Sequence, residues 1–85
     1  MAFERKFQLV KAVLLKLEKK PMRWTPLLKA MIQECGSPPR LYYTLKFLEK
    51  NGFAEKILIK DKPHWNITPK GRELLKALLF DAKIN

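Results

Sequence analysis

Three pairs of a hydroxyl residue followed by proline constrain the fold of this chain more than any other feature. They are Thr25-Pro26, Ser37-Pro38 and Thr68-Pro69. The hydroxyl oxygen can accept a hydrogen bond from an unpaired N–H in the first turn of a helix. Proline at the first helical position has a fixed helical φ and no N–H that would be left unpaired there. Each pair therefore predicts the start of a helix.

Two longer helices are expected at the ends of the chain, over about residues 3–20 and 69–83. In the first of them, Phe7, Val10 and Leu14 are separated by steps of three and four, which places them on one face. The last helix has more apolar surface than a single core face needs. Part of that surface should therefore contact a second subunit.

Two short helices are expected between them, within about residues 26–51. Gly36 should end the first short helix and Gly52 the second, because glycine readily adopts the left-handed conformation found after many helices. Only Gly36 and Ser37 separate the two helices. Such tight joining is typical of the helix-turn-helix motif, and a plain helical hairpin is the alternative.

After Gly52 the apolar pattern changes from helical spacing to a period of two, which indicates strands. The polar segment 60–63 predicts the turn of an antiparallel hairpin, or wing, over about residues 53–67. Met22-Arg23-Trp24 is a candidate for a short third strand. Phe53, Ile57 and Ile59 are expected to share one face of the first strand, and Trp65 and Ile67 are expected to point inward from the second.

These elements predict a mainly helical α+β fold in a single domain over residues 1–85, because 85 residues suffice for one modest core. The expected order is helix, short strand, helix, helix, strand, strand, helix. That order corresponds to a winged helix-turn-helix.

The chain is strongly basic, with 18 Lys and Arg against 8 Asp and Glu and a formal net charge of +10. A positive surface attracts polyanions, and nucleic acid is the first candidate. The alternative is that the excess lysine only keeps the protein soluble. No apolar stretch approaches the roughly 20 residues that span a bilayer, and the N-terminal residues lack a signal-peptide block. We therefore expect no membrane partner and a cytoplasmic, nucleoid-associated location.

The sequence offers little for catalysis or metal binding. Cys35 and His64 are the only cysteine and histidine, and the glycines stand singly. We expect no enzyme activity, metal, cofactor or small-molecule ligand. Cys35 should be a small buried hydrophobic residue, with pairing across a dimer as the alternative.

Two stretches of the chain carry a resemblance to known regulators. Residues 41–55 resemble the recognition helix, the glycine that ends it and the following strand of winged-helix regulators, closest to the PadR and MarR families. Residues 67–75 resemble the strand-to-helix exit of the same proteins. The small size and high lysine content are also similar to compact winged-helix proteins of archaea and archaeal viruses.

The resemblance implies a transcriptional regulator that binds double-stranded DNA as a homodimer. Its recognition helix would enter the major groove, and its wing would contact the backbone or the minor groove. RNA or ribosome binding and protein interaction are the alternatives, because winged helices also occur as such modules.

The candidate DNA-binding residues lie on the helix face opposite Leu41, Leu45 and Leu48 and along the hairpin. Arg40 can pair with O6 and N7 of guanine, which typically contributes about 1–3 kcal/mol of discrimination. The alternative for Tyr42 and Tyr43 is that one of them packs partly into the core. Phe47 is expected to be exposed, with packing on the wing, the neighbouring helix or a second subunit as the alternative. The full set is Thr25, Ser37, Arg40, Tyr42, Tyr43, Lys46, Lys56, Lys60, Lys62 and His64.

A homodimer would place its two recognition helices in successive major grooves, about 34–36 Å apart. The apolar faces of the first and last helices are the expected contact. The candidate interface residues are Phe3, Phe7, Val10, Leu14, Leu75, Leu78, Leu79 and Phe80.

Overall fold

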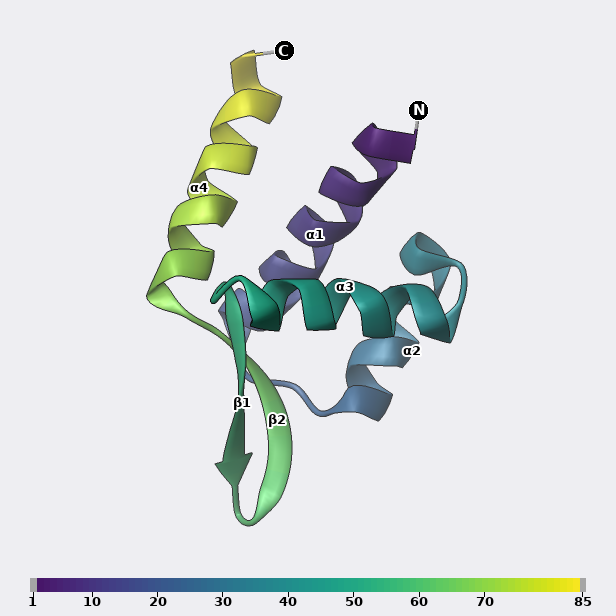
Figure 1. Ribbon diagram of the computed structural model, residues 1–85, viewed down its shortest axis with the longest axis vertical. Coiled ribbons are helices and arrows are strands. Elements are labelled where there is room, and N and C mark those ends of the chain that lie inside the picture. Colours follow the sequence, from purple (N-terminus) through teal and green to yellow (C-terminus); the bar gives the residue numbers. More distant parts are fainter. Residues whose placement is uncertain (1, 85) are drawn as a thin grey trace.

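The computed structural model describes the backbone of residues 2–84 and the surroundings of the side chains of residues 7–80. Its elements are α1 (Ala2–Lys19), α2 (Trp24–Cys35), α3 (Pro38–Lys50), β1 (Ala54–Ile59), β2 (Lys62–Ile67) and α4 (Pro69–Ile84) (Figure 1). The fold is mainly helical with a small antiparallel sheet. The order of helices and strands agrees with the predicted one, except that the short strand expected after the first helix is only an isolated bridge.

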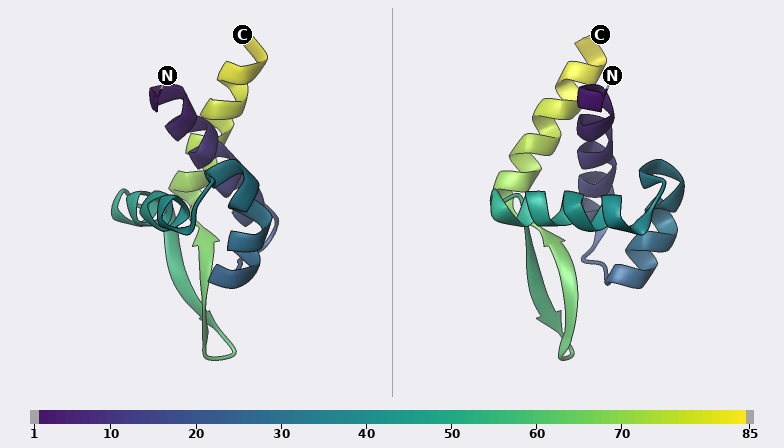
Figure 2. Two further views of the ribbon diagram at one scale, coloured as in Figure 1. Left: turned by 90° about the vertical axis from the view of Figure 1, so that its right-hand side faces the viewer. Right: turned by 45° about the vertical axis from the view of Figure 1, so that its right-hand side comes forward.

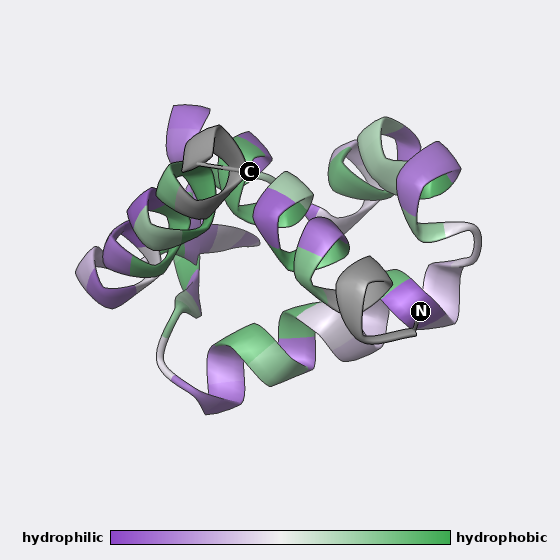
Figure 3. Ribbon diagram, turned by 90° about the horizontal axis from the view of Figure 1, so that it is seen from above, coloured by the Kyte–Doolittle hydropathy of each residue, from purple (hydrophilic) through white to green (hydrophobic). Residues whose placement is uncertain are grey.

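The molecule is elongated and measures 42 × 27 × 21 Å, with the two termini at one end and the hairpin turn at the other (Figure 1). Helices α1 and α4 extend together toward the end that carries both termini, and α3 runs across them (Figure 1). The β1–β2 hairpin projects away from the helices in both further views (Figure 2). Seen from the end with the termini, the helices carry hydrophobic and hydrophilic residues side by side, as amphipathic helices do (Figure 3).

The core forms where α1 packs against α2, α3 and β2, with α4 along its side. Burying each large apolar side chain contributes roughly 1.5–3 kcal/mol. The buried residues are Val10, Val13, Leu14, Leu17, Leu27, Met31, Cys35, Leu41, Leu45, Leu48, Ala54, Trp65, Ile67 and Leu75. The predicted core positions of the three α3 leucines and of Cys35 are confirmed.

The predicted helix starts are confirmed at two of the three hydroxyl–proline pairs. Helix α3 begins at Pro38 with Ser37 as its extended N-cap, although the Ser37 side chain makes no capping hydrogen bond. Helix α4 begins at Pro69, and the N–H of Gly71 donates to Oγ1 of Thr68 at 3.0 Å. Thr68 is therefore a true side-chain cap.

The predicted start of the second helix is wrong by two residues. Helix α2 begins at Trp24 with Arg23 as its N-cap, and the N–H of Leu27 donates to the Arg23 carbonyl at 3.1 Å. The reason is tertiary, because residue 22 pairs with β2 and the chain is free to turn into a helix directly afterwards. Thr25 lies in the first turn, and Pro26 beside it still occupies a position that needs no N–H donor.

Glycines end the two short helices as predicted. Gly36 has φ 79° and donates its N–H to the carbonyl of Ile32 at 2.9 Å, which closes the last turn of α2. Gly52 follows α3 with φ 78°. Both conformations are left-handed and strain any residue with a β-carbon.

The hairpin turn is shorter than predicted. Lys60 and Asp61 have φ values of 53° and 64°, the pattern of a two-residue type I′ turn, and Ile59 pairs directly with Lys62. Lys62 and Pro63 therefore belong to β2.

The apolar odd-numbered residues of β1 do not share the face of Trp65 and Ile67. Strand β1 pairs Ala54 with Ile67 and Lys56 with Trp65, so even-numbered β1 residues share the face of the two buried β2 residues. Ala54 is buried, whereas Ile59 is exposed. Beyond Ala54, β1 extends away from the core. An apolar residue in this part of the strand is therefore not necessarily buried. The prediction for Trp65 and Ile67 is confirmed.

The candidate third strand is reduced to a single bridge. The N–H of Met22 donates to the Trp65 carbonyl at 2.9 Å, and the N–H of Trp65 donates back to the Met22 carbonyl at 2.7 Å. This bridge fixes the start of α2 against the hairpin.

Candidate nucleic-acid interface

The outer face of α3 carries the predicted recognition residues. Because Leu41, Leu45 and Leu48 are buried, helical geometry turns Arg40, Tyr42, Tyr43 and Lys46 to solvent, and all four are exposed. Tyr43 is 70% exposed and Tyr42 46%. Neither tyrosine belongs to the core, so the alternative that placed one of them there is wrong.

Tyr42 is held in an aromatic cluster on this face. Its ring centre lies 6.4 Å from that of Trp24, at an interplanar angle of 78°, and 5.8 Å from that of Tyr43, at 71°. Both pairs are edge-to-face, the geometry in which the positive edge of one ring meets the negative face of another. The cluster links the start of α2 to the outer face of α3.

Arg40 and Lys46, two of the three cations on α3, differ in their surroundings. Lys46 donates to Oε1 of Glu49 at 3.1 Å and lies 5.9 Å from the Tyr42 ring centre. The hydrogen bond to Glu49, and then the negative charge of that carboxylate, raise the pKa of Lys46 above its usual value. Arg40 is exposed, and its guanidinium forms no ion pair within the described part of the chain. Of these two residues, Arg40 is therefore the one whose charge is not already paired with a carboxylate.

The hairpin presents a second group of cations. Lys56, Lys60 and Lys62 are all exposed, and the Nζ atom of Lys56 lies 5.0 Å from the centre of the Trp65 ring. His64 is half-buried, with Nδ1 2.9 Å from the carbonyl oxygen of Lys62. The lysines follow the hairpin from its middle to its tip.

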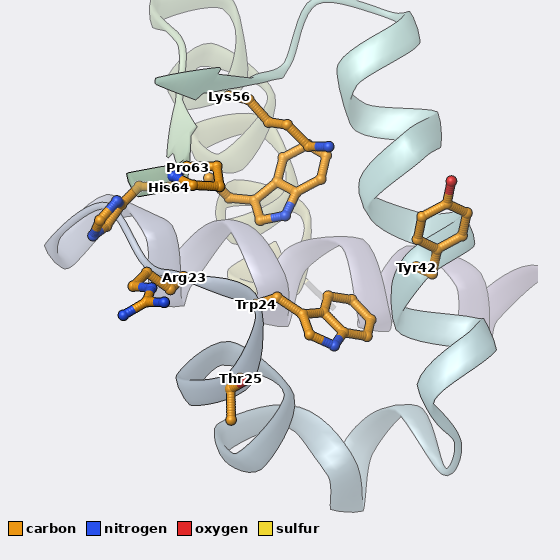
Figure 4. A pocket seen from close by; sticks show the side chains of 8 residues that line it. Arg23, Trp24, Thr25, Tyr42, Lys56, Pro63 and His64 are labelled. Atoms are coloured by element: carbon orange, nitrogen blue, oxygen red, sulfur yellow. The ribbon is translucent and has the colours of Figure 1, made fainter. Parts of the chain in front are cut away.

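A pocket of about 380 Å³ lies between the start of α2, helix α3 and the hairpin (Figure 4). Trp24 lies in its middle, with Tyr42 on one side and Arg23 and His64 on the other. Its lining residues are Arg23, Trp24, Thr25, Tyr42, Lys56, Pro63, His64 and Trp65.

The structure divides the predicted DNA-binding residues into three places. Four of them line the pocket, namely Thr25, Tyr42, Lys56 and His64. On the open face of α3 lie Arg40, Tyr43 and Lys46, while Ser37 is half-buried at the start of that helix. Near the tip of the hairpin lie Lys60 and Lys62.

Sequence reasoning did not include Trp24, Pro63 and Trp65 among the binding residues. Trp24 and Trp65 are far apart in the chain, and the bridge between residues 22 and 65 brings them to the same pocket. The available signal was the pair Arg23-Trp24, because a cation and an aromatic ring are the side-chain types that contact phosphates and bases.

The predicted dimer interface needs a correction. Val10, Leu14 and Leu75 are buried within a single chain, because they fill the space between α1, α4 and the other elements. They are therefore not available to a second subunit. The remaining described candidates are Phe7 and Phe80, which are exposed, and Leu78 and Leu79, which are half-buried. The side chain of Phe3 lies outside the described residues.

Phe47 is half-buried and packs against the core. The expectation that it is exposed is wrong, and the alternative that it packs on a neighbouring element is confirmed.

Over the residues that the structure describes, no three His, Cys, Asp or Glu side chains gather in a group that would hold a metal ion. None of the helices searched in that same region is long and apolar enough to cross a membrane. In comparisons with known proteins, no family model and no curated protein matches the chain.

Proposed function

We propose that this protein is a winged helix-turn-helix domain that binds double-stranded DNA and regulates transcription. The observation that carries the proposal is the exposure of Arg40, Tyr43 and Lys46 on one face of α3, beside a hairpin with three further exposed lysines. A helix and a hairpin with cations of this kind suit the major groove and the neighbouring backbone.

The order of elements supports the fold assignment. Helices α2 and α3 are joined by Gly36 and Ser37 alone, and the hairpin follows α3 directly. In a winged helix the second helix of the motif is the recognition helix and the hairpin is the wing. The bridge from Met22 to Trp65 takes the place of the small third strand.

In the proposed complex, α3 enters the major groove with its N-terminal half closest to the bases. Arg40 pairs with a guanine, and Tyr43 contacts a phosphate or a thymine methyl group. Lys60 and Lys62 contact phosphates and contribute affinity to every sequence alike.

We further propose that the protein acts as a homodimer. The exposed ring of Phe80, at 62% exposure, and the half-buried Leu78 and Leu79 form the apolar surface of α4 that a second subunit would cover. A two-fold axis would place two copies of α3 on a pseudo-palindromic site.

Selection of duplexes from a random pool, followed by binding measurements at several salt concentrations, tests the proposal. We expect an enriched sequence and a linear fall of log K with log salt concentration. Structured RNA should compete less well than the selected duplex. No enriched sequence, or tighter binding to RNA, would contradict it.

A further inference from the structure

The pocket beside α3 combines aromatic and cationic side chains, and recognition of a paired duplex does not require this combination. We propose that it holds a single unpaired nucleotide of the bound DNA, with the base against Trp24 and the phosphate near Arg23 and Lys56. This inference rests on the proposed function, because the same strand must first lie along α3 and the hairpin.

The aromatic side of the pocket suits a base. Trp24 is half-buried, so part of its indole remains accessible, and it forms an edge-to-face pair with Tyr42 at 6.4 Å between ring centres and an interplanar angle of 78°. Pro63 and Trp65 complete the apolar lining. Bases stack on aromatic side chains regardless of sequence, since every base has a π-face. The bases of an intact duplex are already stacked on each other, so an unpaired base gains most from this surface.

The polar side of the pocket suits a phosphate. Arg23, Lys56 and His64 line it, and neither Asp nor Glu occurs among its described lining residues. Both Arg23 and Lys56 are exposed, and Arg23 lies across Trp24 from Tyr42 (Figure 4). A cation on each side of an aromatic surface matches a ligand that has a flat ring and an anionic group.

The size and position of the pocket favour a nucleotide within a strand over a free one. A volume of about 380 Å³ falls in the range of about 300–1,000 Å³ that small-ligand sites occupy. Lys56 lies on β1, and Lys60 lies in the hairpin turn that follows β1. A strand would bring several phosphates to these lysines, whereas a mononucleotide brings only one.

The experiment compares three fluorescently labelled duplexes of the same sequence by anisotropy. The first is fully paired, the second has one extra unpaired thymidine, and the third has an abasic residue at that extra position. We expect the second duplex to bind about tenfold more tightly than the first, which corresponds to about 1.4 kcal/mol. The abasic duplex keeps the phosphate and the bend but lacks the base, so it should lose most of that gain.

Two variants assign the gain to the pocket. Trp24→Leu keeps an apolar side chain but removes the stacking surface, and it should abolish the preference for the unpaired thymidine. Lys56→Gln and its matched control Lys60→Gln each remove one hairpin charge. Both variants should bind all three duplexes less tightly. Only Lys56→Gln should lower the ratio of the affinity for the second duplex to the affinity for the first. Thermal melting by circular dichroism verifies that each variant folds. If Trp24→Leu does not fold, the comparison of Lys56→Gln with Lys60→Gln still tests the proposal.

The outcomes separate the two proposals. If no duplex binds, the proposed function fails. If the three duplexes bind equally, duplex binding stands and the nucleotide pocket is overturned. An abasic duplex that binds as tightly as the thymidine duplex would also overturn it, because the base would then contribute nothing. The same holds if thymidine monophosphate saturates a tryptophan fluorescence change at micromolar concentration while the duplexes show no difference.

Discussion

The hydroxyl group of Thr68 donates a hydrogen bond of 2.6 Å to the carbonyl oxygen of Gly52. The hydroxyl oxygen of Thr68 in turn accepts the N–H of Gly71 at 3.0 Å. A single side chain therefore caps α4 and ties its start to Gly52, two residues after the end of α3. Lys70 adds a parallel link, since its Nζ donates to the carbonyl of Asn51 at 3.0 Å.

Replacing Thr68 by valine should lower the free energy of unfolding by about 1–2 kcal/mol. The change keeps the β-branched shape but removes both the cap and the bond to Gly52. Urea denaturation followed by circular dichroism measures the effect. Thr25→Val is the matched control, because Thr25 is exposed and does not cap α2. Its effect should stay within about 0.5 kcal/mol, and equal losses in the two variants would refute the assigned cap.

Gly71→Ala should destabilise the protein more than Gly36→Ala. A β-carbon at Gly71 would collide with the backbone carbonyl of Phe53 and with the side chain of Ile67, so α4 or the start of the hairpin would have to shift. We expect a loss of about 2–3 kcal/mol, typical of overpacking. At Gly36 a β-carbon meets open space, and only the left-handed φ of 79° is strained, which costs about 1 kcal/mol. Denaturation midpoints rank the two variants, and the reverse order would contradict the close packing of α4.

Cys35 should react slowly with a thiol reagent in the native protein. Its side chain is 1% exposed in the core, so reaction requires opening of the structure. The reaction rate should rise with urea concentration toward that of the unfolded chain. Electrophoresis without reductant should show no covalent dimer. Rapid labelling in the absence of urea would contradict the burial.

The sequence predicts the helices of this fold well because their boundaries depend on local chemistry. Pro38, Pro69 and the two glycines at positions 36 and 52 act through their own backbone preferences, and no distant contact is needed. The start of α2 depends instead on a bridge between residues 22 and 65, which local reasoning does not reveal.

The facing of the hairpin and the pocket were hard to predict for a related reason. Ile59 is apolar but exposed, whereas Lys56 lies on the face that leads to the core, because the hairpin leaves the body of the protein after its first pair of residues. The pocket joins Trp24 to Trp65, which are brought together only by tertiary folding. An apolar pattern also does not distinguish a side chain that is buried within its own chain from one that is buried by a second subunit. Leu14 was assigned to the dimer interface but is buried within its own chain.

If the proposed DNA complex is correct, Arg40→Ala and Lys62→Ala should have different effects. Loss of Arg40 should relax the preference at one base pair by about 1–3 kcal/mol, because its planar fork reads a base edge. Loss of Lys62 should weaken all sequences alike and reduce the salt slope by about 1. Anisotropy with the selected duplex and single-base variants of it measures both effects. Identical profiles for the two variants would remove Arg40 from its reading role.

Phe80→Asp should convert the proposed dimer into a monomer without unfolding it. The ring is 62% exposed in the single chain, so its loss costs little core packing, whereas a carboxylate in an apolar interface would be desolvated without a partner. Sedimentation at micromolar concentration measures the oligomeric state, and thermal melting measures stability. Leu58→Asp is the matched control, because Leu58 is 72% exposed on the hairpin and receives the same charge far from α4. If the unmodified protein is already a monomer, or if both variants remain dimeric, the α4 interface is wrong. A monomer that still binds the selected duplex would bind a single half-site, with affinity reduced because the second contact is lost.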